Sequence, residues 1–438
     1  MHTIPPLILV FPFIGLLLMI ATGPIFFQKL WHHHYPKISV GLGVIVFLYY
    51  GFVMDNFLHP LETIAEYISF ISLLVILFVA SGGIYVFIDV ESKPLTNIVF
   101  LFIAAILTNL VGTTGASVLL IRPFMRINRY RLQPYHIVFF IFIVSNLGGL
   151  LTPIGDPPLF MGYLKGVPFE YTFIHLFPKW IVAIAGILLV FFLVDRKNTK
   201  LDEVDSNIHY TNKVLINGKR NFIWLLIGIA SIFIDPNLID ALPHIDIAGK
   251  KISFIREIIQ LSAAFFCFKL SDKNALLSND FSFEPIKEVA WLFIGIFLTM
   301  IPALQWLEHL AQDPAISNKI SASVAYWFSG VFSSVLDNAP TYLNVFAVVL
   351  AKFGFSIESV ESVRAFLKTE HINYLSALST GAVFFGAMTY IGNGPNFMVK
   401  SIADQAGVKM PSFGTYIFKY SIPYLLPVLV LVWLLFYC

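Results

Sequence analysis

Residues 152–161 read Thr-Pro-Ile-Gly-Asp-Pro-Pro-Leu-Phe-Met, and residues 389–398 read Thr-Tyr-Ile-Gly-Asn-Gly-Pro-Asn-Phe-Met. The two decamers share six of their ten residues. Each lies in a long apolar stretch and is too rich in glycine and proline to remain a regular helix. A broken helix frees N–H and C=O groups that lipid cannot satisfy, so the break must be buried in protein or line a watery cavity. The repeated break predicts a fold built from two related halves.

The composition places these decamers in a membrane protein. Of 438 residues, 58% are hydrophobic and only 12% are charged, whereas a soluble domain averages roughly 25% charged residues. The 28 basic and 26 acidic residues give a net charge of +2, which argues against nucleic acid as a partner and leaves the lipid bilayer. Cys267 and Cys438 are the only cysteines, so neither a disulfide framework nor a thiolate metal cluster is expected.

About 20 apolar residues cross a hydrocarbon core. This length predicts ten transmembrane helices, near residues 7–20, 38–54, 67–90, 136–161, 177–194, 221–235, 254–270, 288–304, 373–400 and 415–437. Two further apolar stretches, 95–121 and 321–351, are interrupted midway by polar or helix-breaking residues and are predicted to be re-entrant hairpins. The predicted class is an all-α polytopic membrane protein with an inverted repeat, about ten transmembrane helices, two re-entrant hairpins and two broken helices.

The distribution of basic residues supports the first hairpin. With the N-terminus outside, the predicted cytoplasmic segments carry 16 Lys and Arg and the outer segments carry 7. The two most basic loops, 122–135 and 195–220, both fall inside only if 95–121 enters and leaves on one side. We therefore expect a multi-pass protein of the plasma (inner) membrane with these loops in the cytoplasm.

The two halves are expected to have opposite topology. A hairpin precedes each decamer, and a long helix, 67–90 or 288–304, precedes each hairpin. In the predicted orientation one of these helices runs inward and the other outward. The predicted organisation is N-terminal scaffold helices at 1–63, a first repeat at 64–194, a cytoplasmic linker at 195–220, connecting helices at 221–285 and a second repeat at 286–438.

Inverted repeats with paired, interrupted segments are typical of secondary transporters that bind their substrate near the midplane. Freed carbonyls can coordinate cations, and half-helix N-termini can hold anions. A passive channel would not need two inverted copies around such a site. An intramembrane aspartyl protease is a poor match, because those enzymes need Gly-x-Gly-Asp and position 153 is proline. We expect a transporter and not an enzyme.

Two acids fall at the predicted breaks. Asp156 lies in the first decamer, where its partner in the repeat is Asn393, and Asp337 lies at the second hairpin tip, opposite Thr108 or Asn109. Intramembrane carboxylates are costly and usually functional. A buried acid favours its neutral form, so it could release a proton when Na⁺ binds, or stay neutral while a coupled anion binds. The alternative role for both acids is capping a half-helix.

The order of hairpin, broken helix, linker, second hairpin with Leu-Asp-Asn-Ala-Pro-Thr at 336–341 and second broken helix resembles the ion transporter superfamily. Within that group, the motifs look most like the NhaD-type sodium/proton antiporters and the citrate transporter branch. The resemblance implies an elevator-like movement, a homodimer, and Na⁺ as the coupling or transported ion with no other cofactor.

The resemblance also implies a cation or substrate site at the tips and broken helices, with no catalytic residue. The candidate residues are Thr108, Asn109, Thr113, Thr114, Thr152, Gly155, Asp156, Asp337, Asn338, Thr341, Thr389, Gly392 and Asn393. Among them, Asp156, Asp337, Asn109 and Asn338 are the predicted Na⁺ ligands. Two departures matter: the first tip has Thr-Asn where antiporters often have Asp-Asn, and neither tip has the Ser-Asn-Thr of divalent anion symporters. We predict Na⁺/H⁺ antiport, with Na⁺- or H⁺-coupled carboxylate (citrate-like) transport as the alternative.

Overall fold

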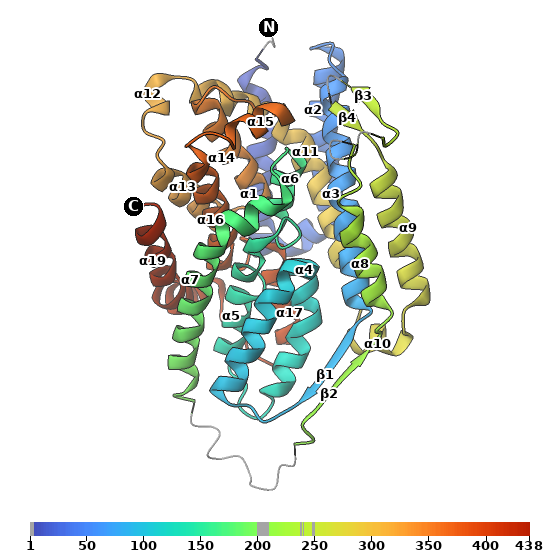
Figure 1. Cartoon of the computed structure of the whole chain (residues 1–438), viewed down its shortest axis with the longest axis vertical. Coiled ribbons are helices and arrows are strands. Elements are labelled where there is room, and N and C mark those ends of the chain that lie inside the picture. Colours follow the sequence, from blue (N-terminus) through green and yellow to red (C-terminus); the bar gives the residue numbers. More distant parts are fainter. Residues whose placement is uncertain (1–3, 199–209, 237–238, 240, 248–249) are drawn as a thin grey trace.

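Helices form most of the part of the chain that the computed structural model describes, residues 4–198, 210–236, 239, 241–247 and 250–438 (Figure 1). From the N-terminus to the middle of the chain the elements are η1 (Leu7–Val10), α1 (Phe11–Phe26), α2 (Gln28–Phe52), α3 (Leu58–Gly82), β1 (Tyr85–Asp89), α4 (Pro94–Ile127), α5 (Pro134–Ile143), η2 (Leu147–Leu151), α6 (Pro157–Leu164), α7 (Phe169–Asp195), β2 (Lys213–Asn217), α8 (Asn221–Ser231), β3 (Ile245–Ile247), β4 (Lys250–Ile252) and α9 (Ile255–Leu270).

The remaining elements are α10 (Lys273–Ser278), α11 (Glu284–Ala311), α12 (Pro314–Ser317), α13 (Ala322–Val335), α14 (Asn338–Lys352), α15 (Val360–Phe366), α16 (Ile372–Phe385), η4 (Gly386–Met388), α17 (Gly394–Gln405), α18 (Phe413–Tyr416), the π-helix η5 (Ile417–Leu425) and α19 (Leu426–Phe436). One main apolar core includes residues of both halves, for example Leu73 in α3 and Phe346 in α14.

The helices confirm an all-α polytopic membrane protein. Among the described residues, seven helical stretches are long and apolar enough to cross a bilayer, and three shorter apolar helices accompany them. Each of the ten predicted spans overlaps at least one observed helix, and several of them, 136–161, 373–400 and 415–437 included, contain more than one. The chain is therefore an integral, multi-pass membrane protein.

The first interrupted stretch is a hairpin, although α4 extends over 34 residues. Gly112 has φ 77° and ψ 159°, a conformation that breaks the helix and that favours glycine. Asn97 and Asn128 exchange two side-chain hydrogen bonds of 2.9 Å, although 31 residues separate them. A straight helix would hold these residues about 46 Å apart. The chain thus reverses at Gly112 into two limbs, 4a (94–111) and 4b (113–127), as Figure 1 shows.

The second interrupted stretch also reverses. α13 and α14 are separated by Leu336 and Asp337 in extended backbone conformations. At the far end of α14, Lys352 Nζ donates at 2.6 Å to the carbonyl oxygen of Ser317, which ends α12 five residues before α13 begins. This base lies at the end of the molecule that carries α12 and α15, whereas the base of the first hairpin lies at the end with β1 and β2 (Figure 1). The two hairpins therefore enter from opposite ends.

The helices that precede the hairpins are antiparallel. His59 in α3 lies 3.4 Å from Gln305 in α11, and eight residues further along α3 the Tyr67 hydroxyl donates to the carbonyl oxygen of Ala290 at 2.9 Å. Residue numbers thus fall along α11 as they rise along α3. Phe70 and Phe293 stack between the two helices at 4.9 Å. This crossing gives the two halves the opposite topology of an inverted repeat.

Two short ribbons interrupt the helical fold and correct the sequence prediction. The predicted helix 67–90 was too long, because α3 ends at Gly82 and residues 85–89 form β1. β1 pairs antiparallel with β2, with Tyr85 opposite Asn217. β-branched and aromatic residues at 84–88 favour a strand once Gly82-Gly83 ends the helix. The predicted linker therefore contributes β2, while its residues 199–209 lie outside the described residues; β3 and β4 pair among the connecting helices.

A buried ionic cluster fixes the base of the first hairpin. Arg131 and Asp195, both almost fully buried, form an ion pair of 2.8 Å. Asp195 also accepts hydrogen bonds from the Tyr135 hydroxyl at 2.6 Å and from Asn97 Nδ2 at 3.1 Å. Breaking a buried pair costs about 3–5 kcal/mol, since it leaves one charge without a partner. The cluster holds limb 4a, α5 and the end of α7 together as one bundle.

The hairpin can be tested by crosslinking. In a chain with Cys267→Ala and Cys438→Ala, the substitutions Asn97→Cys and Asn128→Cys should form a disulfide under mild oxidation, because the two side chains touch. Mass spectrometry of the digested protein measures the linked peptide. The control pair combines Asn97→Cys with Thr114→Cys near the hairpin tip and should stay unlinked. A continuous α4 would leave both pairs unlinked.

Candidate functional site

The candidate site forms where four half-helices begin. In each half, one of these helices is the second limb of the hairpin and the other follows the broken decamer: limb 4b and α6 in the first half, and α14 and α17 in the second. The last residues before these four helices are Gly112, Asp156, Asp337 and Asn393. Side chains at all four starts meet around a single carboxylate, that of Asp156.

Asp156 is 1% exposed and accepts one hydrogen bond from each of the other three helix starts. Its Oδ1 accepts from the Thr113 hydroxyl at 2.8 Å and from Asn393 Nδ2 at 3.0 Å. Its Oδ2 accepts from Asn338 Nδ2 at 2.5 Å. All three donors are neutral, and no ion pair to Asp156 occurs within the described ranges. The structure thus brings three of the predicted residues, Thr113, Asn338 and Asn393, to the buried carboxyl group of a fourth, Asp156.

Hydrogen bonds that recur in both halves define their equivalent positions. The Thr152 hydroxyl donates to the carbonyl oxygen of Asn109, and the Thr389 hydroxyl donates to that of Ser334, both at 2.6 Å. Asn109 and Ser334 are therefore equivalent. Counting forward from them, Gly112 corresponds to Asp337 and Thr113 to Asn338. The predicted pairing of Asp337 with Thr108 or Asn109 was therefore wrong by three or four residues. The residues at the equivalent turn positions are glycine in one half and aspartate in the other, so sequence similarity could not reveal the alignment.

Glycine pairs pack the broken segments closely in both halves. A Cβ on Gly155 would lie 2.1 Å from the carbonyl oxygen of Gly149, and a Cβ on Gly392 would lie 2.6 Å from that of Gly386. Real Cβ contacts are never so short, so both positions require glycine. The Thr113 amide, in turn, donates to the carbonyl oxygen of Gly155 at 2.8 Å. The predicted residues Gly155 and Gly392 act through backbone packing.

Other predicted residues hold the tips in place. Asn109 Nδ2 donates to the carbonyl oxygen of Gly148 at 2.7 Å, and its Oδ1 accepts from the Leu151 amide at 2.8 Å. Thr108 donates to a carbonyl oxygen within its own limb, and Thr341 donates to that of Asp337. These side chains satisfy the broken backbone. Thr114 is half-buried beside Thr113.

The two predicted acids differ in their surroundings. Asp337 is half-buried, and its Oδ1 accepts from the Ala339 amide at 3.0 Å, so it caps α14. Asp156 precedes α6, but its side chain makes no capping hydrogen bond: Pro157 and Pro158 have no N–H, and the Leu159 amide donates to the Asp156 carbonyl oxygen instead. The carboxylate of Asp156 is therefore directed to the other tips, and Asn338, not Asp337, reaches it from the second hairpin.

The sequence interpretation missed a second layer of amides. Asn146 Nδ2 donates to Asn396 Oδ1 at 2.8 Å, and Asn396 Nδ2 donates to the carbonyl oxygens of Gly386 and Thr389. Asn393 Nδ2 also lies 3.0 Å from the carbonyl oxygen of Ser145. An asparagine at 396, where the first decamer has leucine, was a signal that could have pointed to this layer. These contacts join the two halves behind Asp156.

One acceptor beside the carboxylate has no partner. Asn338 Oδ1 is buried and makes no hydrogen bond, although the same amide donates to Asp156. A buried polar atom left unsatisfied costs about 1–3 kcal/mol. Asp156 Oδ2, Asn338 Oδ1 and Thr113 Oγ1 thus offer oxygen ligands close together. In the part of the chain that the structure describes, no three His, Cys, Asp or Glu side chains are placed to hold a metal ion. The oxygen set suits a monovalent cation or a proton.

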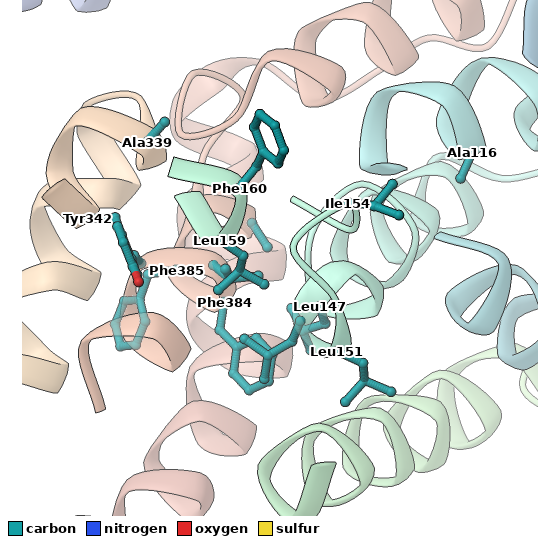
Figure 2. Close-up of a cluster of buried hydrophobic side chains, with 14 of the residues drawn as sticks. Ala116, Leu147, Leu151, Ile154, Leu159, Phe160, Ala339, Tyr342, Phe384 and Phe385 are labelled. Carbon is teal, nitrogen blue, oxygen red and sulfur yellow. The ribbon is translucent and has the colours of Figure 1, made fainter. Parts of the chain in front are cut away.

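Apolar side chains surround this polar centre. Figure 2 shows Ile154, Leu159 and Phe160 from the first break, with Tyr342 and Ala339 from α14 and Phe384 from α16 close by. Packing of this kind excludes water and lowers the local dielectric, which strengthens every electrostatic interaction inside. Ionising Asp156 without a bound cation would therefore cost a large free energy.

The inverted repeat, the broken helices and the acid at their meeting point define the class of a multi-pass secondary transporter. The chain belongs to the family CitMHS_2, described as "putative citrate transport", whose model matches residues 2–437. This membership supports the predicted ion transporter superfamily and a role in transport, and it does not test the predicted NhaD-type branch. No curated protein matches the chain.

The glycine packing generates a stability test. Gly155→Ala should lower the stability of the detergent-solubilised protein by about 3 kcal/mol or prevent its folding, because the added methyl meets a backbone oxygen that cannot move aside. Gly394→Ala is the matched control, since a Cβ there meets nothing within 4 Å. Thermal unfolding followed by size-exclusion chromatography measures both variants. Equal stability of the two would contradict the packing of the broken segments.

Proposed function

We propose that this protein is a cation-coupled secondary transporter of the plasma membrane in which Asp156 binds Na⁺ and H⁺ in alternation, and that it exchanges Na⁺ for H⁺. The observation that carries the proposal is a fully buried carboxylate that receives only neutral donors, one from each of the other three helix starts. An isolated buried charge is costly. Either a proton or a cation removes that cost, so the two compete for one site.

The Asn338 amide gives this competition a structural basis. With Asp156 ionised, Asn338 Nδ2 donates to the carboxylate. With Asp156 protonated, the amide can turn so that its Oδ1 accepts the proton of the acid. With Na⁺ bound, the same Oδ1 joins the carboxylate and the Thr113 hydroxyl as a ligand. Proton and cation thus use overlapping oxygens and exclude each other.

The proposed movement carries the hairpins past a scaffold that includes α3 and α11, in an elevator-like step within a homodimer. Ion pairs join the hairpin side to the scaffold side at both ends of the molecule. Lys165, after α6, pairs with Glu66 of α3 at 2.7 Å, and Arg122 of limb 4b pairs with Asp280, after α10, at 3.1 Å. These contacts are candidates for breaking and reforming as the site moves from one side to the other.

Carboxylate transport coupled to Na⁺ or H⁺ is the second candidate, and the family membership favours it. Four half-helix N-termini meet at the site, and the positive ends of their dipoles attract anions. Prolines at 157, 158, 340 and 395 remove four of the N–H groups in the first turns of these helices, which would bind such an anion directly. A carboxylate would therefore depend on the remaining amides, on Asn and Thr side chains and on a cation held by Asp156.

The role of Asp156 can be tested in proteoliposomes. Asp156→Asn removes the titrating group with little change in volume, so an imposed Na⁺ gradient should move protons no faster than in empty liposomes. A pH-sensitive dye inside the vesicles measures the exchange. Glu284→Gln, an exposed acid paired with Lys287, is the control and should keep the wild-type rate. Full exchange by Asp156→Asn would remove the carboxylate from the mechanism.

The two candidate activities make different predictions for one preparation. Exchange predicts that a Na⁺ gradient moves protons without citrate, and that labelled citrate does not accumulate. Carboxylate transport predicts that labelled citrate accumulates only when Na⁺ or H⁺ enters with it. If a Na⁺ gradient moves no protons at any pH while citrate uptake depends on Na⁺, the second candidate replaces the first.

A further inference from the structure

A cavity of about 750 Å³ lies at the end of the molecule that carries the first hairpin base, between limb 4b, β1, α10 and the end of α17. These elements lie together at the end of Figure 1 that carries β1 and β2. The polar side chains that line it include Asp89, Arg122, Arg126, Arg129, Asp280 and Gln405. Its volume falls within the usual range of small-molecule sites, about 300–1,000 Å³.

Two of the three arginines have an acidic partner: Asp89 for Arg129 and Asp280 for Arg122. Arg129 pairs with Asp89 at 2.9 Å. Hydrogen bonds from the Thr211 hydroxyl and amide, together with Arg129, lower the pKa of Asp89 to about 2. Asp89 therefore stays ionised at neutral pH, and the Arg129 charge is compensated there.

Arg122 and Arg126 have unused donors. Arg122 Nη2 donates to Asp280 at 3.1 Å, but its Nη1 is buried and makes no hydrogen bond. The Arg126 guanidinium lies over the Phe87 ring at 4.5 Å and forms no ion pair with the residues that the structure describes. The two arginines stand four residues apart and so share one face of limb 4b. The charged residues that line the cavity are three arginines and only two acids, Asp89 and Asp280. An anion bound in the cavity would balance this excess of positive charge.

We propose that Arg122 and Arg126 form a binding site for an oxyanion with two or more carboxylate or phosphate groups. The planar guanidinium matches carboxylate and phosphate oxygens in pairs, which a single chloride would not use. The Arg126 guanidinium lies over the ring of Phe87, and both side chains line the cavity. The site is independent of whether Asp156 exchanges Na⁺ for H⁺.

The cavity is separate from the site at Asp156. Limb 4b begins at Thr113, which contacts Asp156, and reaches Arg122 nine residues later, about 14 Å along the helix. Val118, midway between them, packs with Phe78 and Ile286 in a small apolar cluster. This apolar cluster lies along limb 4b between the cavity and the carboxylate. An anion at the arginines would thus lie near the opposite end of limb 4b from Asp156.

Ligand-dependent stabilisation of the full-length protein tests the site. In neutral detergent, citrate should raise the unfolding temperature of the wild type, and R122Q or R126Q should weaken its apparent affinity about 10-fold or more, since each removes charged hydrogen bonds. The control R196Q changes an exposed arginine at the end of α7 and should respond like the wild type. R126K keeps the charge but loses the fork and should be intermediate, which separates binding from misfolding.

Two further arms identify the source of the oxyanion and the location of binding. Nanodiscs with and without cardiolipin, whose headgroup carries two phosphates, test a lipid headgroup. Stabilisation by this anionic lipid alone, dependent on both arginines, assigns the site to lipid. D156N should keep the arginine-dependent effect, even if the proposed exchange at Asp156 fails. The proposal is overturned if R122Q and R126Q respond to both probes like the wild type, or if D156N alone abolishes the citrate effect.

Discussion

The fold of this protein depends on hydrogen bonds to the backbone groups that the helix breaks leave without partners inside the membrane. Where the chain leaves the helix, its N–H and C=O groups have no water to bind, so the tips must satisfy one another. The Thr113 amide donates to Gly155, the Leu151 amide donates to Asn109, and Thr152 and Thr389 bind the tips across from them. Because these partners come from different segments, the breaks can be buried only when hairpins and broken helices pack together.

This packing leaves one charge at the centre. The two halves place related groups at equivalent positions, Thr113 with Asn338 and Asp156 with Asn393, but only one of the four carries a carboxylate. A second acid at 393 would lie 3.0 Å from the first, where two negative charges repel strongly. The backbone is therefore nearly symmetric while the charge is not, and a proton or a monovalent cation bound at Asp156 would neutralise the carboxylate among these four groups.

The ion pairs away from Asp156 fall into two groups, those within the first hairpin and its neighbours and those that join the hairpin side to the scaffold side. Arg131 and Asp195 are buried together and join the first hairpin to α7 as a unit. Arg122 and Lys165 instead reach across to the scaffold side, at opposite ends of the molecule. Pairs within the bundle keep it rigid, whereas pairs across the boundary are few and partly exposed, so they can be exchanged at low cost. A rigid bundle with weak end contacts suits a movement between two positions.

The sequence alone determined the membrane class, the two breaks, both hairpins and the inverted order of the halves, because apolar length, Gly and Pro positions and the repeated decamer are local signals. It misjudged the end of α3, where a strand replaces the predicted helix, and the equivalence of Asp337, which caps α14. Only the tertiary structure decided which groups surround Asp156. Thr113, Asn338 and Asn393 lie 43, 182 and 237 residues from it, and no local pattern carries a contact over such separations.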